Sequence, residues 1–265
     1  MLAGSFLAVG MGAAQAQVCH PDNPYDSIST SFHQSVAQRT DGGWAGWGQG
    51  LDKGSNALSP TDITSDDFAG MGEPLRMTTA SSTTNHQTIA LTANGLYVWG
   101  SNDIVFANSN TYLENAVSGV RKVKDFPSAN ISGLPTGTLP GGGFYDIQPD
   151  DVTMMTASYG ALAIVAKVGS EQYAWLFTSR SNADGWLGVG RNKWELVQTK
   201  EDESDPVPLS DVKAMRVQNG DTASSGAVMV HAGDKVYTFG NSVYLGGGDN
   251  KITPAYAQGL RTRIS

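Results

Sequence analysis

Few residues in this sequence have the types and spacing that chemistry requires. Two carboxylate pairs, Asp66-Asp67 and Asp150-Asp151, offer the residue type of a glycoside hydrolase, which holds two carboxyl groups about 5–10 Å apart. Both pairs precede the same expected strand of a repeated unit, so the repeat explains them without catalysis. The sequence has no G-x-S-x-G turn, H-E-x-x-H helix or Walker loop. We therefore predict that the chain is not an enzyme, the alternative being a polysaccharide-active hydrolase or lyase that uses the paired carboxylates.

The acidic residues and histidines do not form a recognisable metal site. Oxygen ligands of the kind that calcium prefers come from four acidic residues of one segment, Glu201, Asp202, Glu203 and Asp205. Their spacing is not that of a calcium-binding loop, so a solvated acidic loop is the simpler interpretation. His33 and His86 occupy equivalent positions of two repeated units, which indicates polar residues at the entry to a strand. We predict no metal site and no cofactor, with calcium on the acidic segment as the one candidate.

Tryptophan is the residue type that best suggests a binding surface. We expect Trp47, Trp99 and Trp175 to lie on the second strand of repeated hairpins and to pack between units. Trp186 and Trp194 flank a loop, where an exposed indole could stack on a sugar or anchor a protein interface. These two are the candidate binding residues, and packing inside the fold is the alternative for both.

The composition excludes several classes of protein. Of the 265 residues only 16% are charged, against an average of about 25%, and 32 are Gly, about 12% against an average of about 7%. This composition argues against a helical bundle. The 17 basic and 25 acidic residues give a net charge of −8, which argues against a nucleic-acid partner because phosphate contact needs a basic patch. A single Cys excludes a disulfide scaffold and a zinc site built on thiolates.

The first residues resemble a targeting segment. Residues 1–16 are uncharged and mostly small or apolar, and Ala14-Gln15-Ala16 fits a signal-peptidase site. We expect a signal-like segment over 1–16, a linker over 17–28, and a secreted, cell-surface or periplasmic protein. A buried apolar helix is the alternative for residues 1–16. No later apolar run approaches the length of about 20 residues that a membrane span needs.

Four similar segments divide the rest of the chain, over residues 33–48, 86–100, 161–178 and 226–240. Each is an apolar run, a polar turn and a second run with aromatic residues, the pattern of a β-hairpin. Asn94-Gly95 is the strongest turn signal, while Gly169-Ser170-Glu171-Gln172 predicts a longer turn in the third unit. A hairpin cannot bury both of its faces alone, so the units must stack in a propeller or a solenoid.

The ends of the units resemble the regulator of chromosome condensation repeat. Tyr97-Val98-Trp99-Gly100-Ser101-Asn102 matches the first part of its motif, and Leu187-Gly188-Val189-Gly190 and 245–248 match its Leu-Gly-x-Gly end. Thr178 replaces the usual Gly of the third unit, so that turn must be built differently. The resemblance implies an all-β propeller of four-stranded blades of an exported bacterial type, over residues 29–265.

The resemblance also implies a ring of about seven blades, of which this chain supplies about four. Four enlarged blades that close on themselves, or an open arc that associates with another copy, are the alternatives. Residues 127–143 have no counterpart in the other units and predict a long surface loop between blades two and three.

The function that these observations favour is binding. A rigid ring presents many loops on a shared surface, and the sequence supplies no set of reacting groups. We expect a macromolecule-binding module whose partner is a protein or a cell-surface macromolecule. A structural module of a long surface adhesin is a further alternative.

Overall fold

The structure is a computed structural model. It describes residues 28–49, 56–64, 70–82, 84–100, 104–106, 113–116, 119–124, 133–178, 193–199, 207–219, 226–240 and 251–256. Residues 1–27, which hold the predicted signal-like segment, lie outside this part of the chain, so that segment stays a prediction. The described residues contain no helix long and apolar enough to cross a membrane.

Four four-stranded antiparallel sheets make up the fold, and consecutive strands pair in each of them. Blade 1 contains β1 (Ile28–Thr30), β2 (Gln34–Gln38), β3 (Trp44–Gln49) and β4 (Asn56–Ile63). Blade 2 contains β5 (Pro74–Ser81), β6 (His86–Thr92), β7 (Gly95–Gly100) and β8 (Arg121–Lys122). Blade 3 contains β11 (Val152–Ser158), β12 (Ala161–Val168), β13 (Glu171–Thr178) and β14 (Lys193–Leu196). Blade 4 contains β17 (Val212–Asn219), β18 (Gly226–Ala232), β19 (Lys235–Gly240) and β20 (Lys251–Tyr256).

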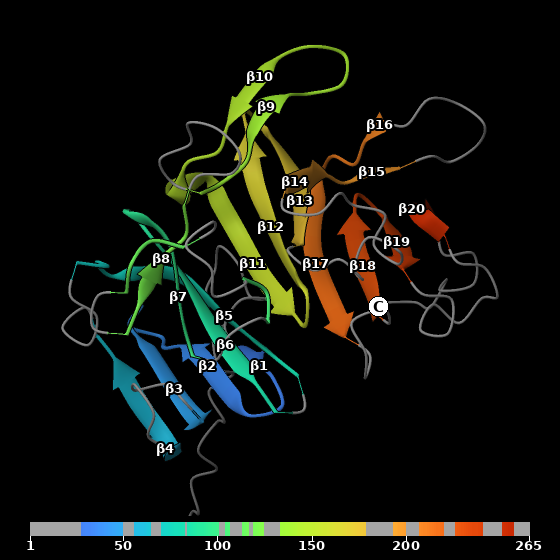
Figure 1. Ribbon diagram of the computed structural model, residues 1–265. Coiled ribbons are helices and arrows are strands. Elements are labelled where there is room, and N and C mark those ends of the chain that lie inside the picture. Colours follow the sequence, from blue (N-terminus) through green and yellow to red (C-terminus); the bar gives the residue numbers. More distant parts are fainter. Residues whose placement is uncertain are drawn as a thin grey trace, which may run out of the picture.

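The four sheets are arranged as the blades of a propeller. Their first strands, β1, β5, β11 and β17, lie together near the centre, and each contacts the next. The sheets fan outward from there, from lower left to right in Figure 1, and β4, β8, β14 and β20 are the last strands of the four sheets. The prediction of an all-β propeller with four-stranded blades is therefore confirmed. Whether a ring of about seven blades contains these four stays a prediction.

Side-chain hydrogen bonds connect the first strands of neighbouring blades. The hydroxyls of Ser29 on β1 and Thr78 on β5 lie 3.0 Å apart. Thr78 Oγ1 also accepts a hydrogen bond from the backbone N–H of Ala157 on β11, at 3.1 Å. Further along, the backbone N–H of Met215 on β17 contacts Met154 Sδ at 3.2 Å. Ser, Thr and Met at these positions thus fix one blade against the next where the backbones come closest.

Three apolar clusters fill the three spaces between consecutive blades. Trp99, 5% exposed, packs between blades 1 and 2, and Trp175, fully buried, packs between blades 2 and 3, as predicted. Trp47 is only half-buried, and Trp44 supplies the second indole between blades 1 and 2 instead. The reason is register: Trp44 shares a face of the sheet with Val36, which points at blade 2.

Burial along the strands reflects how many neighbours a blade has. Residues 161–166 of β12 are all buried, because blade 3 has a blade on each side. On β18 of blade 4, buried Val228 and Val230 alternate with Met229, which is 49% exposed. A continuous apolar run and an alternating one therefore mark an inner and an outer blade of this arrangement.

All four predicted hairpins are present, and one turn differs from the prediction. The β12–β13 turn consists of Gly169 and Ser170 alone, because Val168 pairs with Glu171. The predicted longer turn is therefore wrong. Three hairpins end in a glycine with positive φ, and a Cβ on Gly100 would lie 2.7 Å from the carbonyl oxygen of His86. In blade 3 a glycine with positive φ, Gly160, lies instead in the turn before β12, next to Ala161, which pairs with Thr178.

The segment predicted as a long loop between blades 2 and 3 is partly ordered as strands. β9 (Thr136–Thr138) and β10 (Phe144–Asp146) form a separate two-stranded sheet. A 3-10 turn, η2 (Pro149–Asp151), leads from β10 into β11. A second small sheet, β15 (Gln198–Thr199) and β16 (Val207–Pro208), lies between blades 3 and 4. Residues 127–132 lie outside the described part of the chain.

Candidate binding surface

The β9–β10 hairpin projects beyond the four sheets, at the top of Figure 1. Its register pairs Phe144 with Thr138, Tyr145 with Gly137, and Asp146 with Thr136. The chain enters it from blade 2 and leaves it toward β11. It is therefore an addition to the repeat, placed where one blade is joined to the next.

The turn of this hairpin has a defined geometry. The Leu139 N–H donates to the Gly143 carbonyl at 2.8 Å, and the Gly142 N–H donates to the Leu139 carbonyl at 3.0 Å. Gly142 has φ +102°, which an L side chain rarely adopts. The β2–β3 turn of blade 1 repeats both bonds with Arg39 and Gly43. A run of glycines that reads as a loop thus forms a tight turn.

The base of the hairpin rests on the core between blades 2 and 3. The ring of Tyr145 lies 5.2 Å from that of the fully buried Trp175. Leu134 and Ile147, at the two ends of the hairpin, are each 1% exposed. The Trp194 Nε1–H donates to the carbonyl of Gly133 at 3.0 Å. These contacts hold the hairpin in one position relative to the blades.

The opposite side of the hairpin faces solvent. Phe144 is 71% exposed, and Thr136, Thr138 and Asp146 are exposed as well. This follows from strand alternation, since Tyr145 points to the core and its two neighbours on β10 point away. Phe144 is thus an aromatic side chain held in water by a fixed backbone.

The two candidate tryptophans have different outcomes. Trp186 lies outside the described residues. Trp194 lies on β14, half-buried, with its ring 5.4 Å from that of buried Phe177 and its N–H bonded to Gly133. Its contacts are those of a residue that packs inside the fold and supports the hairpin. A binding role for either residue stays a prediction.

The structure brings His33 and His86 together at the junction of blades 1 and 2. Their ring centroids are 6.4 Å apart in an edge-on arrangement, and Phe32, 78% exposed, lies beside His33. Burial, and secondarily the His33 imidazole, lower the pKa of His86 below its ordinary value. The buried Nδ1 atom of His86 has no hydrogen-bond partner in the described structure, so a proton added there would gain no acceptor.

The acidic candidates do not converge in the part of the chain that the structure describes. Asp151 caps the short η2 turn, where its Oδ2 atom accepts from the Gln148 N–H at 2.9 Å. Asp66-Asp67 and the acidic segment 201–205 lie outside the described residues. Among the described residues, no group of three or more His, Cys, Asp or Glu side chains could hold a metal ion.

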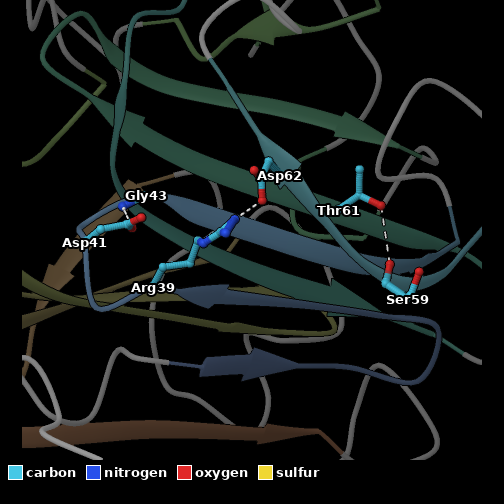
Figure 2. Close-up of polar contacts among 6 residues, drawn as sticks. All are labelled: Arg39, Asp41, Gly43, Ser59, Thr61 and Asp62. Carbon is cyan, nitrogen blue, oxygen red and sulfur yellow. Dashed lines mark hydrogen bonds and ion pairs between the residues drawn. The ribbon is translucent and has the colours of Figure 1, made fainter.

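Charged residues at the edge of blade 1 form an ion pair on the surface. Arg39, the first residue after β2, pairs with Asp62 on β4, and the Gly43 N–H donates to Asp41 Oδ1 at 2.9 Å (Figure 2). Both partners of the ion pair are well exposed, so the pair contributes little stability. It ties the outer strand to the neighbouring turn and offers no reactive group.

Phe144 and Phe32, two of the most exposed apolar side chains, were not singled out by the sequence analysis. A signal existed for Phe144. Thr136-Gly137-Thr138 and Phe144-Tyr145-Asp146 are short runs with Thr and aromatic residues that flank a Leu-Pro-Gly-Gly-Gly turn. Phe32 had no comparable signal, because its exposure depends on how two blades meet.

No protein-family model matches the chain, and no curated protein matches its sequence. Similar solved structures include human WBSCR16, at 12% identity and a TM-score of 0.47, over 87% of this chain and 52% of that one. Prp20p of Saccharomyces cerevisiae, which binds Gsp1p and histones, is 14% identical with a TM-score of 0.46, over 89% and 50%. Yeast RCC1 (Prp20) bound to Kap60 is 15% identical with a TM-score of 0.47, over 89% and 49%. The chain therefore spans about half the length of these proteins.

Proposed function

We propose that this chain is a protein-binding module that contacts its partner through the β9–β10 hairpin. The observation that carries the proposal is Phe144, which is 71% exposed on a strand whose other face is packed on Trp175. Aromatic anchors supply much of the energy of protein interfaces. A hairpin that is already fixed in place loses little conformational freedom on binding, which favours affinity.

The sheet faces of the two inner blades are not available to a partner. Blades 2 and 3 are covered by neighbours, so their sheet faces contribute to the core. The hairpin reaches past those blades and its exposed side carries one charged residue, Asp146. A protein surface with a pocket for one aromatic ring fits this element better than a phosphate backbone, which would meet no basic group on it.

Affinity capture with matched variants tests the proposal. The full chain captures partners from the surface fraction of its host, and Phe144→Ser is compared with Met229→Ser, which removes a 49% exposed apolar side chain of blade 4. We expect the partner to be lost with Phe144→Ser and kept with Met229→Ser. Equal capture by both variants would contradict the proposal.

The proposed setting is the cell exterior or the periplasm. It rests on residues 1–16, whose small apolar sequence ends in Ala14-Gln15-Ala16. N-terminal sequencing of the protein purified from its host tests this directly. A mature chain that begins at Gln17 supports export, and a chain that retains residues 1–16 contradicts it.

A further inference from the structure

The free edge of β10 has the properties of a strand that accepts another strand. β9 and β10 form a two-stranded sheet, and among the described strands neither pairs with any other. An edge strand presents backbone N–H and C=O groups that can pair with an extended segment of another chain.

Two hydrogen bonds at the ends of the hairpin determine which backbone groups of β10 point outward. Leu139 is bonded to Gly143 near the turn, and the Ile147 N–H donates to the Pro135 carbonyl at 3.1 Å at the other end. In an antiparallel ladder, bonded pairs alternate with pairs that are not bonded. Tyr145 and Gly137 are therefore the bonded pair between these two.

The pairs on either side of Tyr145–Gly137 are the pairs without mutual hydrogen bonds. Phe144 and Asp146 belong to these pairs, so their N–H and C=O groups point away from β9. The Gln148 side-chain amide reaches the Asp146 carbonyl from outside at 3.5 Å, which agrees with that direction. The outward groups that an added strand can use are the N–H and C=O of Phe144 and the N–H of Asp146.

Four other strands that lie at sheet edges carry features that discourage pairing. The outer strand of blade 1, β4, contains Pro60, and β20 contains Pro254, neither of which has an N–H to donate. The outer strand β8 consists of Arg121 and Lys122 alone. The strand β9 is flanked by Pro135 and Pro140. Proline and lysine are residues with which proteins protect sheet edges.

The strand β10 differs from these four strands, since Phe144, Tyr145 and Asp146 include neither Pro nor a basic residue and no Pro adjoins them. Phe144 and Asp146 are both exposed and, being two residues apart, project from the same face of the strand. An added strand would place one residue beside the Phe144 ring and another, two positions away, beside the Asp146 carboxylate. Cross-strand pairs of this kind favour an apolar side chain in the first place and a cation in the second.

We infer that β10 binds an extended segment of a partner protein by strand addition, and that this segment carries an apolar and a basic residue two positions apart. The inference rests on the proposed function and names the kind of partner for the same hairpin. Backbone hydrogen bonds to Phe144 and Asp146 supply the pairing. The phenyl ring and the carboxylate select the sequence.

A matched pair of variants isolates the backbone contribution. Asp146→Ala and Asp146→Pro both remove the carboxylate, but only Asp146→Pro also removes the outward N–H. The β9–β10 ladder does not use this N–H, and Tyr145, which precedes it, is already in the extended conformation that proline requires of its neighbour. The probe is a phage-displayed library of random linear peptides selected against the full chain.

We expect enriched peptides with an apolar and a basic residue two apart, and binding to Asp146→Pro about five- to tenfold weaker than to Asp146→Ala. Equal binding to the two variants would overturn strand addition, and so would a selection that enriches no linear peptide. Loss with Phe144→Ser but not with Asp146→Pro would leave the proposed function standing and remove this inference alone. If peptides pair with β10 but Phe144→Ser leaves partner capture unchanged, strand addition stands and the proposed function is contradicted.

Amide hydrogen exchange of the wild-type chain gives an independent measurement, in case Asp146→Pro disturbs the hairpin. In the free protein the Tyr145 and Ile147 amides should be protected, because they donate within the hairpin, while those of Phe144 and Asp146 exchange freely. On addition of a selected peptide, the Phe144 and Asp146 amides should become protected. If these two amides exchange at unchanged rates in the complex, the peptide does not bind as a strand.

Discussion

The glycine at the end of the β6–β7 hairpin offers a sharp test of how the blades are built. Gly100→Ala adds one methyl group at a residue with φ +101°, and that Cβ would lie 2.7 Å from the backbone oxygen of His86. Gly142→Ala is the matched control, because φ there is +102° and nothing lies within 4 Å of the added atom. Both variants place an alanine in the same unfavourable backbone conformation. Only in Gly100→Ala does the added methyl group also contact the backbone of a neighbouring strand.

The magnitudes follow from these two contributions. The left-handed conformation costs an alanine about 1–2 kcal/mol, which is the whole effect expected for Gly142→Ala. The contact with His86 is backbone against backbone, so it can be relieved only by moving strands, which costs roughly 1–3 kcal/mol more. We expect Gly100→Ala to lower the free energy of unfolding by about 2–5 kcal/mol in total.

Urea unfolding followed by tryptophan fluorescence measures both variants, since Trp99 lies in the core next to Gly100. The midpoint should fall further for Gly100→Ala, while the slope of free energy against urea stays the same for both. Amide exchange of blade 2 then shows whether the loss is local to β6 and β7, as it can be in a repeat protein. If the two variants lose the same stability, close strand approach is not the reason for a glycine at this position.

Three further outcomes are expected. Trp194→Phe should lower the free energy of unfolding in urea by about 1 kcal/mol, because the hydrogen bond to Gly133 is lost. Trp47→Phe is the control: this indole is half-buried outside the three clusters, and its replacement should change that free energy by less than about 0.5 kcal/mol. Ser29→Ala should cost about 1–2 kcal/mol, because the Thr79 N–H loses its acceptor and Thr78 loses a partner. The pKa of His86 is lowered in the folded state, so the unfolded chain binds more protons than the folded chain below about pH 6.5. The contribution of His86 to stability should therefore be full above that pH and be lost as the pH falls through the lowered pKa. Urea unfolding at several pH values measures this dependence, and His86→Gln should flatten it.

The repeated part of the fold could be predicted from the sequence because each hairpin carries its own local signals. Alternating apolar runs and turn residues place β6 and β7 around Asn94, and the same pattern recurs in the other blades. Stacking then follows, because a single hairpin cannot bury both faces. The third turn was predicted too long because Glu171 and Gln172 are polar, although both lie in β13 and Gln172 pairs with Lys167.

Which tryptophan packs between blades could not be predicted with the same success. Trp44 and Trp47 lie on the same strand on opposite sides of the sheet, and the hairpin pattern does not say which side faces blade 2. That choice depends on the position of β1 against β5, where Ser29 meets Thr78. It is a contact between residues 49 positions apart, which local patterning does not encode.

The position of the candidate binding hairpin follows from the repeat even though its sequence does not. The chain must run from the outer strand of one blade to the inner strand of the next, and this connection crosses one end of the propeller. Residues 64–73 form the first of these connections and contain no strand among their described members, whereas the two later connections carry β9–β10 and β15–β16.

A connection of this kind can lengthen without disturbing the blades, because the strands that pack lie before and after it. An added hairpin there gains a rigid base from the blade that follows it, as Tyr145 does on Trp175 and Gly133 does on Trp194, both of blade 3. The sequence of this connection can therefore change while the four sheets stay the same. For that reason we assign binding to the β9–β10 hairpin, which has no counterpart in the repeated units.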